Sequence, residues 1–485
     1  MRFVDRKREL LALERFMAQP SAGLMILFGR RRVGKTRLLT YFAEEKSIQN
    51  AFYWTATTHG EVYQLRDFSR ALLNYASQFG TIPITDDFSF PDWEAAFRFL
   101  SDTIARADGP QLIVIDEFTY LIRNNAAITS VLQKTWDHNL SQQSHLRLVL
   151  TGSLIGMMER EVLSYQAPLY GRATSLLRLR PLPYAALTEL FPEREPAERV
   201  AIYGISGGVP AYLELFDRAP TFAQALKEQC FAPGSIVLTD PALILYEQLH
   251  EPQIYESVLS AIAGGFHTWK DIARMAGVVE SSLGHYLKVL QELELVERRD
   301  PILSRPGGRR GRYHVRDHFL RFYYRFIVPH ITNIERGYVE AAYNQIRSDL
   351  RAFIGAYIFE ELCREWMIAA AATGELGFHP DSVGSYWGRH RGAGVQLDVV
   401  AASKRERKLL IGEAKWGQGL VGRKVVMDLI KRSTRMPQTG EGWNVEYVLF
   451  AREGFTEAAQ EAAIELRTRL VTLDEIEKRL IAAQS

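Results

Sequence analysis

The first 180 residues alternate short apolar runs with longer segments in which apolar side chains recur at helical spacing. The longer segments, such as residues 65–79 and 93–107, predict amphipathic helices. Strands that alternate with helices are typical of a parallel sheet covered on both faces, so we predict an α/β fold. The apolar runs that predict buried strands are residues 24–28, 52–54, 112–115, 146–151 and 175–179.

The pattern changes further along the chain. Residues 184–250 are mostly helical in pattern, and residues 251–330 predict helices followed by two short strands. Residues 331–350 predict a helical linker, and residues 351–485 return to an α/β pattern. We therefore expect an N-terminal unit at 1–183 followed by these four segments. In the last of them we expect helices at 353–372 and after Gly422, and strands at 395–401, 408–413 and 445–450.

A glycine-rich segment follows the first predicted strand and matches the pattern G-x-x-x-x-G-K-[ST]. Such glycines let backbone N–H groups wrap a phosphate at the start of a helix. We expect Lys35 to reach the β- and γ-phosphates and the Thr36 hydroxyl to hold Mg²⁺. A chance glycine turn is the alternative, which the preceding strand and the helical run at 37–45 disfavour. The residues expected to bind the nucleotide here are Gly29, Arg30, Arg31, Arg32, Val33, Gly34, Lys35, Thr36 and Arg37.

Two acids end the third predicted strand. We expect Asp116 to contribute to the Mg²⁺ site and Glu117 to polarise the attacking water as a general base. Ser153 ends the next strand, where a polar side chain can contact the γ-phosphate or the water. Arg172 is a candidate for stabilising phosphate charge, in its own chain or in a neighbouring copy. The alternatives are solvated acids at a strand end, a simple turn at Ser153 and an ordinary surface arginine at position 172.

Composition narrows the class of protein. Of 485 residues, 47% are hydrophobic and 24% are charged, which is ordinary for a globular chain with a sizeable core. The formal net charge is +2, so any nucleic-acid surface must be a local patch. Cys230 and Cys363 are too few for a disulfide framework and indicate a reducing cytoplasm. No apolar run approaches the ~18 residues of a membrane span, and the charged first residues are unlike a signal peptide.

Residues 251–330 predict a winged helix-turn-helix. Helices at 257–263, 268–276 and 281–293, the last capped by Ser281, precede wing strands at 295–299 and 312–315. The third helix has the position of a recognition helix. Residues 298–325 hold nine arginines and two aspartates, a local charge of +7 that suits DNA phosphates. A protein-contact or packing module is the alternative. The residues expected to contact DNA are Ser281, Ser282, His285, Lys288, Arg305, Arg309, Arg310 and Arg312.

Three acids and a lysine are prominent in the C-terminal segment. Glu360 lies on a predicted helix, Asp398 on one strand, and Glu413 and Lys415 on the next. Residues two apart on a strand share a face, so Glu413 and Lys415 are expected to lie together. Asp398 and Glu413 are then candidates to bind one or two divalent ions, while Lys415 orients water or neutralises a phosphate. This is the chemistry of phosphodiester hydrolysis. A solvated Glu–Lys pair is the alternative.

The N-terminal motifs together resemble the archaeal and bacterial P-loop ATPases related to the AAA+ and STAND groups. The matching segments are 3–10, 29–36, 112–117, 150–153, 168–172 and 207–212. The resemblance implies ATP rather than GTP, a first segment near the adenine, and a helical lid at 184–250. The sequence also lacks an N/TKxD-type guanine-reading motif after the fourth strand.

The C-terminal segment resembles the PD-(D/E)xK fold, in particular the restriction-endonuclease-like tail often attached to such ATPases. Residues 359–365 match the first helix of that fold, and residues 451–459 and 470–476 match its ending. No proline precedes Asp398, and Gln396 stands where relatives often carry an acid, so one metal position is expected to be weak. The predicted fold is a P-loop sheet with a helical lid, a winged helix and a small α/β nuclease-like domain.

We therefore expect a protein that binds and hydrolyses ATP with Mg²⁺, associates with DNA and carries a nuclease-like tail. The main alternative is a STAND-like regulatory switch that turns ATP over slowly and whose tail binds DNA or a partner without cleaving. A degenerate tail on a transcription-regulating ATPase is the third reading. No membrane partner is expected, and the sequence leaves open whether the protein forms a homo-oligomer.

Overall fold

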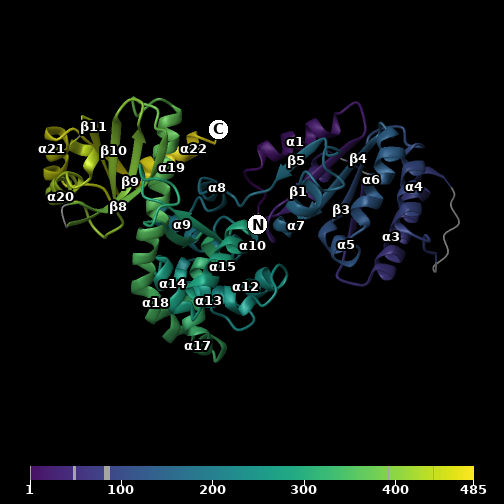
Figure 1. The fold of residues 1–485 in the computed structure, drawn as a ribbon, viewed down its shortest axis with the longest axis horizontal. Helices are drawn as coiled ribbons and strands as arrows, with labels where there is room; N and C mark the ends of the chain where they lie inside the picture. The colour runs from purple at the N-terminus through teal and green to yellow at the C-terminus, as the bar shows by residue number, and fades with distance from the viewer. Residues whose placement is uncertain are drawn as a thin grey trace. The chain divides into compact units, whose positions relative to one another are not determined.

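The computed structural model describes residues 2–46, 48, 51–80, 88–390, 393–440 and 442–484. Its contacts divide the chain into two compact units, whose ribbons are coloured along the chain in Figure 1. The parallel-sheet unit comprises Asp5–Pro181 and Val209–Ala211. The mixed-sheet unit comprises Met1–Val4, Leu182–Gly208 and Tyr212–Ser485.

The parallel-sheet unit is built on a five-stranded sheet in the order β2-β3-β4-β1-β5. Every neighbouring pair in it is parallel, which confirms the predicted α/β class. The central strands are buried on both faces, as expected where helices cover a parallel sheet. The strands are β1 (Gly23–Phe28), β2 (Phe52–Thr55), β3 (Gln111–Asp116), β4 (Leu146–Gly152) and β5 (Ser175–Arg178).

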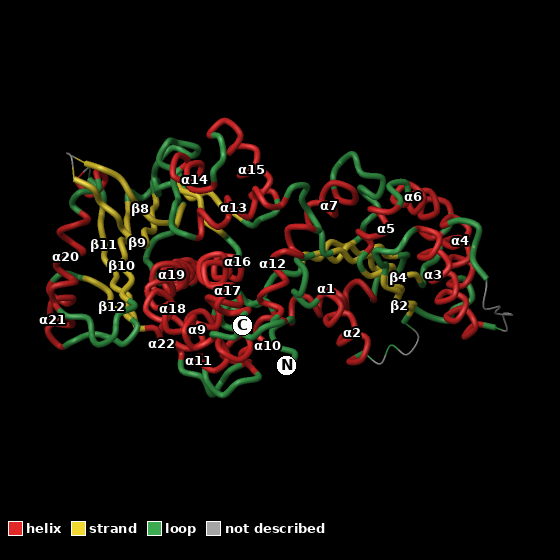
Figure 2. The backbone as a smooth tube through the Cα atoms, turned by 90° about the horizontal axis from the view of Figure 1, so that it is seen from below, coloured by secondary structure: helices red, strands yellow, loops and turns green. Residues whose placement is uncertain are grey.

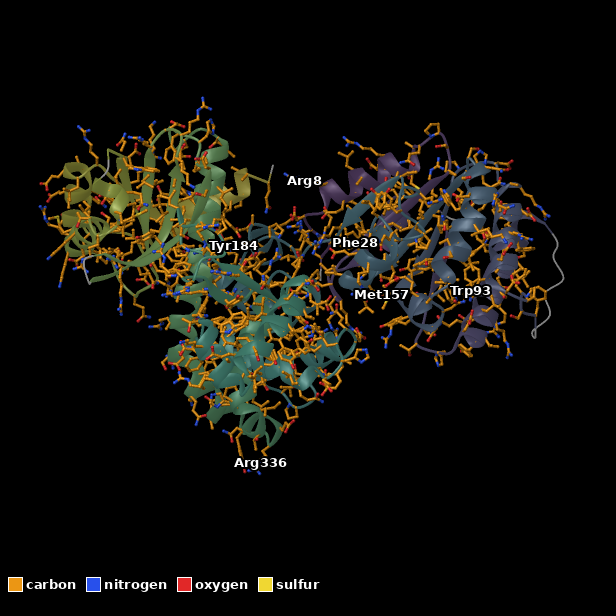
Figure 3. All side chains as sticks on the ribbon, viewed as in Figure 1. Arg8, Phe28, Trp93, Met157, Tyr184 and Arg336 are labelled. Carbon is orange, nitrogen blue, oxygen red and sulfur yellow. The ribbon has the colours of Figure 1, made fainter. Side chains whose placement is uncertain are left out.

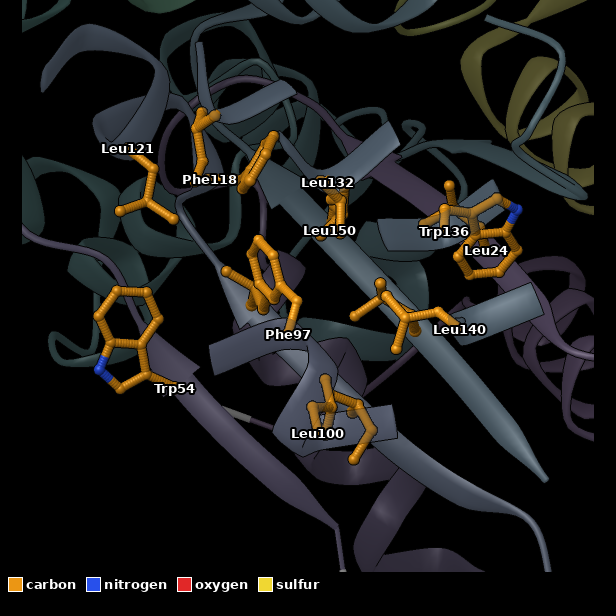
Figure 4. Close-up of a cluster of buried hydrophobic side chains, with 14 of the residues drawn as sticks. Leu24, Trp54, Phe97, Leu100, Phe118, Leu121, Leu132, Trp136, Leu140 and Leu150 are labelled. Atoms are coloured by element: carbon orange, nitrogen blue, oxygen red, sulfur yellow. The ribbon is translucent and has the colours of Figure 1, made fainter. Parts of the chain in front are cut away.

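Helices between the strands supply the other half of this core. In Figure 4, Leu24 and Leu150 of the sheet lie among Phe97, Leu132 and Trp136 of two helices. Asp92 caps one of these helices by accepting a hydrogen bond from the Ala95 N–H at 2.7 Å. The helices of this unit are α1 (Lys7–Met17), α2 (Lys35–Glu45), α3 (Glu61–Ala76), α4 (Trp93–Ile104), α5 (Phe118–Asn124), α6 (Ile128–His138) and α7 (Ile155–Met158).

The mixed-sheet unit contains a second five-stranded sheet, in the order β12-β11-β10-β9-β8. Strands β8, β9 and β10 are antiparallel neighbours, whereas β10, β11 and β12 run parallel. Figure 2 shows this sheet between α20 and α21 on one side and α19 on the other. Its strands and helices are β8 (Ser382–His390), β9 (Ala393–Ser403), β10 (Lys408–Lys415), β11 (Asn444–Ala451), β12 (Thr468–Thr472), α19 (Glu360–Ala372), α20 (Arg423–Ser433), α21 (Glu457–Glu465) and α22 (Leu473–Ala482).

The rest of this unit is mainly helical. Helices α13, α14 and α15 are followed by the antiparallel pair β6–β7, the order predicted for residues 251–330. One detail of the prediction is wrong: α15 begins at Glu280 after Val279, so Ser281 lies in its first turn rather than at its cap. The elements are α8 (Ala186–Leu190), α9 (Pro196–Ser206), α10 (Pro210–Asp217), α11 (Phe222–Ala225), α12 (Ile236–Tyr246), α13 (Pro252–Ala263), α14 (Trp269–Ala276), α15 (Glu280–Glu292), β6 (Val296–Arg299), β7 (Arg312–Val315), α16 (His318–Phe322), α17 (Ile331–Glu335) and α18 (Val339–Phe353).

The segment between β6 and β7, residues 300–311, is packed against the second sheet instead of projecting freely. Ile302 is buried in the core of that sheet, and its N–H donates to the Ser385 carbonyl at 2.9 Å. At the other end of the segment, the Trp387 indole N–H donates to the Arg310 carbonyl at 2.8 Å. The arginine-rich segment between β6 and β7 is therefore a docked loop, because Ile302 is buried in the core of the second sheet.

A buried carboxylate joins the helices of residues 184–250 to the C-terminal helix. Glu477 of α22 accepts from the Arg199 guanidinium at 2.6 and 2.8 Å and from the Tyr184 hydroxyl at 2.9 Å. Tyr184, labelled in Figure 3, is fully buried. Burial and the Glu477 charge both raise the pKa of the Tyr184 hydroxyl, so it stays a donor.

The structure also describes the two cysteines and the lengths of the apolar helices. Cys230 and Cys363 are both free and buried. Within the described ranges, no helix is both long and apolar enough to cross a membrane.

Removal of the Glu477 carboxylate should destabilise the docking of α22. In Glu477→Ala, Arg199 is left as a buried, unpaired charge, which typically costs about 3 kcal/mol or more. We expect amide hydrogen exchange in α22 to accelerate about 100-fold.

Glu465→Ala is the matched control, since Glu465 pairs with Arg423 on the surface at 3.0 Å and both side chains are about half exposed. Its loss should change the exchange rate less than about fivefold. Equal exchange rates in α22 of the two variants would contradict a structural role for Glu477.

Candidate functional site

The glycine-rich loop 29–36 connects β1 to α2 with the backbone that its glycines permit. A side chain at position 29 would lie 2.3 Å from the Leu179 carbonyl oxygen, so only glycine fits there. Gly34 caps α2 with φ +98°, in the left-handed region that favours glycine. The loop therefore leads directly into the N-terminus of α2, where N–H groups and the helix dipole favour an anion.

Lys35 is the buried cation of this loop. Its ammonium donates to the Gly29 carbonyl at 3.0 Å and lies 3.9 Å from the Glu117 carboxylate. Arg6, from the segment before α1, supports the loop by donating to the Val33 carbonyl at 3.3 Å. The position of Lys35 between the loop and a catalytic-type acid suits a phosphate bound at the same place.

Asp116, at the end of β3, is the most heavily hydrogen-bonded carboxylate of the site. It is 2% exposed and accepts from the Thr36 hydroxyl at 2.8 Å and from the Glu117 N–H at 3.1 Å. The hydroxyls of Tyr53 on β2 and Thr151 on β4 also donate to it. Burial and the Asp116 charge raise the pKa of Tyr53 above its ordinary value, which keeps this hydroxyl protonated. Three strands and the loop thus meet at one carboxylate.

Glu117 is held in an uncommon backbone conformation directly after Asp116. Its φ is +52°, in the left-handed region, which costs a non-glycine residue on the order of 1–2 kcal/mol. Its N–H donates to the Thr151 hydroxyl at 3.0 Å, and its carboxylate accepts from the Ser153 N–H and hydroxyl at 3.1 and 2.7 Å. Strain of this kind persists where the surroundings enforce it, and it clusters at functional sites.

The structure brings the predicted nucleotide residues together, with one exception. Loop 29–36, Asp116, Glu117 and Ser153 form one group, as described above. Arg172 instead pairs with Asp137 of α6 through two hydrogen bonds at 2.8 and 3.1 Å. Its remaining hydrogen bonds among the described residues go to carbonyls of its own loop. The guanidinium also lowers the pKa of Asp137, consistent with a structural pair.

The side chains of the other residues that are predicted to bind the nucleotide differ in their exposure to solvent. Arg30, Arg31 and Arg32 are half-buried, Val33 is buried, and Arg37 is exposed, with its guanidinium 3.9 Å from Glu44. Thr36 and Asp116 place two hard oxygen donors side by side, the ligand type that Mg²⁺ prefers. The residues at this site therefore fit an ATP–Mg²⁺ complex.

The second candidate site, at the start of α19 and the centre of the mixed sheet, depends on an irregularity in β9. Gly384 pairs with Val400 and Tyr386 with Leu397, so Asp398 and Val399 together face the single residue Ser385. Such bulges re-aim side chains and are common next to active sites. The Asp398 carboxylate accepts from the Ala414 N–H of β10 at 3.2 Å.

Glu413 and Lys415 lie together on β10 as the spacing predicts, but a third residue joins them. The Glu413 carboxylate is 4% exposed and pairs with both Lys415 and Arg432 of α20. Arg432 was missed by the sequence analysis, because nothing in its sequence neighbourhood connects it to β10. Two cations therefore neutralise Glu413 in this arrangement.

Glu360 opens α19 and completes the group of acids. Burial and the Asp398 charge raise its pKa to about 8, so it is mostly protonated at neutral pH. Burial also raises the pKa of Asp398, although the Ala414 N–H, Lys415 and Arg432 oppose this. A divalent cation would relieve both effects, and Mg²⁺ is often held by one or two carboxylates together with substrate phosphates. Glu360 and Asp398 fit such a cation, whereas Glu413 is already paired.

In the described part of the chain, no group of three or more Asp, Glu, His or Cys side chains is arranged to hold a metal ion. Any metal at this second site would therefore depend on two carboxylates and on the substrate, unless Arg432 releases Glu413. The expectation that Asp398 and Glu413 act together as ligands stays a prediction.

The residues expected to contact DNA fall into two groups. Ser281, Ser282, His285 and Lys288 are exposed on α15. Arg305, Arg309 and Arg310 are exposed and Arg312 is half-buried on the docked loop and β7. Four other arginines of the basic stretch are paired with acids: Arg298 with Asp300, Arg299 and Arg321 with Glu361, and Arg316 with Glu294.

Two family models match parts of this chain. A family described as an ATPase domain predominantly from Archaea matches residues 3–216. A second family, described as archaeal and bacterial proteins of unknown function, matches residues 323–427. Among solved structures, the Walker-type ATPase of Pyrococcus abyssi gives a TM-score of 0.49 with 20% identity, over 66% of this chain and 96% of that chain.

Two curated proteins of Methanocaldococcus jannaschii are similar in sequence. An uncharacterised ATP-binding protein is 55% identical over 49 residues, which is 10% of this chain and 83% of that protein. An uncharacterised protein is 35% identical over 436 residues, which is 89% of this chain and 92% of that protein. Because this second similarity runs through nearly the whole of both proteins, the chain belongs to the same family, with an ATPase domain of the predominantly archaeal type at residues 3–216.

Proposed function

We propose that the parallel-sheet unit hydrolyses ATP with Mg²⁺ and that the mixed-sheet unit associates with DNA. The observation that carries the first part is the meeting of Thr36, Asp116 and Glu117 beside the glycine-rich loop. A metal-holding hydroxyl, a metal-holding carboxylate and a general base are what hydrolysis of a nucleoside triphosphate requires. The matching family of ATPase domains supports the same conclusion.

In this proposal each residue of the site has a separate task. The loop N–H groups and Lys35 bind the β- and γ-phosphates, and Thr36 and Asp116 would hold Mg²⁺. A bound Mg²⁺ neutralises charge that develops on the phosphate oxygens. Ser153 holds the Glu117 carboxylate, which takes a proton from the attacking water. Lys35 lies 3.9 Å from the Glu117 carboxylate, so the proposed base and the cation of the phosphate loop are neighbours.

The DNA part of the proposal depends on residues 251–330, which we interpret as a winged helix. Three helices followed by an antiparallel pair give the order of that module, and α15 carries exposed polar residues at the recognition-helix position. Arg305, Arg309 and Arg310 of the docked loop pair with no acid among the described residues and add positive charge suited to phosphates. A STAND-like switch remains the competing proposal, and DNA-stimulated turnover of ATP distinguishes the two.

A second candidate function is hydrolysis of a phosphodiester bond at the second site, which we interpret as the centre of a PD-(D/E)xK nuclease-like domain. The observation that favours it is the presence of Lys415 among Glu360, Asp398 and Glu413, in a sheet distorted at Asp398. Acids that fit a divalent cation next to a lysine provide what such a reaction needs.

Two substitutions test the assignment of the ATP site. Lys35→Ala should abolish ATP binding, because it removes the cation of the phosphate loop. Glu117→Gln should bind ATP like the unaltered protein and lose hydrolysis by about 100-fold or more, since an amide accepts no proton. Equilibrium binding of a fluorescent ATP analogue and phosphate release measure both effects. Full hydrolysis by Glu117→Gln would show that another group is the base.

Tyr53 provides a test of how Asp116 is positioned. Tyr53→Phe keeps the ring and removes one donor to the carboxylate, so we expect the Mg²⁺ concentration for half-maximal hydrolysis to rise about tenfold. Tyr75→Phe is the matched control: its hydroxyl donates to Gln111 at 2.9 Å, at the opposite end of β3. An unchanged Mg²⁺ requirement in Tyr53→Phe would remove Tyr53 from the site.

The nuclease proposal is tested with supercoiled, linear and branched DNA, in Mg²⁺ or Mn²⁺ and with or without ATP. We expect metal-dependent cleavage by the intact protein and a loss of at least about 100-fold in Lys415→Ala, because the cation next to the scissile phosphate is removed. Cleavage that survives this change would point to a different site. Intact ATP hydrolysis without any cleavage would instead favour the switch with a binding-only tail.

A further inference from the structure

The docked loop and the edge of the mixed sheet line an open cavity of about 770 Å³ within the mixed-sheet unit. One wall is residues 309–312 of the loop and β7, and the other is residues 387–389 of β8 with residues 394–396 of β9. Thr268, just before α14, also lines the cavity. The two walls come from segments more than seventy residues apart, so no local sequence pattern reveals this cavity.

The charge of the lining comes from arginines. Four arginines line the cavity, Arg309, Arg310, Arg312 and Arg389, and none of the described lining residues is acidic. None of these four guanidinium groups has an acidic partner in the part of the chain that the structure describes, unlike the paired arginines of the same basic stretch. Four uncompensated positive charges around one cavity favour a ligand with several phosphates.

An aromatic side chain lies among these charges. The Arg312 guanidinium stacks over the Trp387 ring at 4.8 Å from its centroid, and the Trp387 N–H is held by the Arg310 carbonyl. The ring is therefore fixed in orientation, half-buried and lined by cations. Base stacking on aromatic rings next to a basic groove is the usual way in which proteins hold single-stranded nucleic acid.

The cavity and the second candidate site share strand β9. Gln396, which lines it, pairs with Trp387 across the strands. Asp398 follows Gln396 by two residues on the same strand, about 7 Å at the usual rise of a strand. A backbone held by the arginines would therefore reach Asp398 and Lys415 within about two nucleotides.

We infer that the loop of residues 300–311 and the β8–β9 edge together form a groove for single-stranded DNA that delivers its backbone to the Asp398–Lys415 site. This inference rests on the proposed association with DNA and assigns it to residues that the recognition helix does not include. Arg309, Arg310 and Arg389 contact phosphates, Trp387 stacks on a base, and Gln396 hydrogen-bonds to a base or sugar.

Fluorescence anisotropy with the full chain and a labelled oligothymidylate of about 20 nucleotides, single-stranded or paired with its complement, tests the groove. Arg389→Glu should weaken single-strand binding at least about tenfold and make the salt dependence shallower by about 0.7 in log–log slope. Arg405→Glu is the matched control, because Arg405 is an exposed arginine in the turn between β9 and β10 of the same sheet. It should bind within about twofold of the intact protein.

A second measurement locates the base. Oligonucleotides with 5-bromouracil, irradiated in the complex, should crosslink to the peptide that contains Trp387. Crosslinks confined to α15, or equal affinities of Arg389→Glu and Arg405→Glu, would overturn the groove. If Lys288→Glu then abolished binding, DNA association would stand without the groove. Failure of the intact protein to bind either oligonucleotide would overturn the proposed DNA association as well.

Discussion

A carboxylate removed from water must be neutralised by the protein around it, and the mixed-sheet unit depends on this constraint at Glu361. Glu361 of α19 accepts from Arg299 at 2.7 Å, from Arg321 at 3.2 Å and pairs with His318 at 2.9 Å. Burial opposes its ionisation, but these neighbours outweigh burial and hold its pKa well below the usual range. Because its partners lie on β6 and α16, the Glu361 side chain connects these two elements to α19. Glu360, its neighbour on α19, interacts with the charge of Asp398, and the docked loop directly follows Arg299 in the chain.

In the parallel-sheet unit the buried carboxylate is Asp116, and its partners are hydroxyl groups and not cations. Asp116 is nearly inaccessible, and its charge is satisfied by Thr36, Tyr53 and Thr151 together with the next N–H. Hydrogen bonds from neutral donors stabilise a carboxylate without adding a positive charge next to it. Neutral donors of this kind do not repel a metal ion as a neighbouring cation would. Glu413, which Lys415 and Arg432 neutralise, shows the opposite arrangement at the second site.

Much of the fold was predictable because the signals are local. The five parallel strands and the loop that follows β1 are confirmed, since apolar runs and glycine spacing are properties of short segments. Strand β8 was missed: Ser382–His390 contains two glycines and no alternating apolar pattern, and its pairing with β9 decides its conformation. The docking of loop 300–311 was not predictable for a similar reason. Its glycines and arginines give no local signal that Ile302 is buried in the core of a distant sheet.

The arginines of residues 298–325 show most clearly what the sequence determines and what the tertiary structure decides. The sequence by itself determined that a charge of +7 is concentrated there and that a phosphate loop, two catalytic-type acids and an acid–lysine group exist. Only the tertiary structure decided which charges are free. Four of those arginines are paired with acids, whereas Arg309, Arg310 and Arg312 share a cavity with Trp387. Composition and spacing are fixed along the chain, but the pairing of charges depends on distances of a few ångströms between segments that only folding brings together.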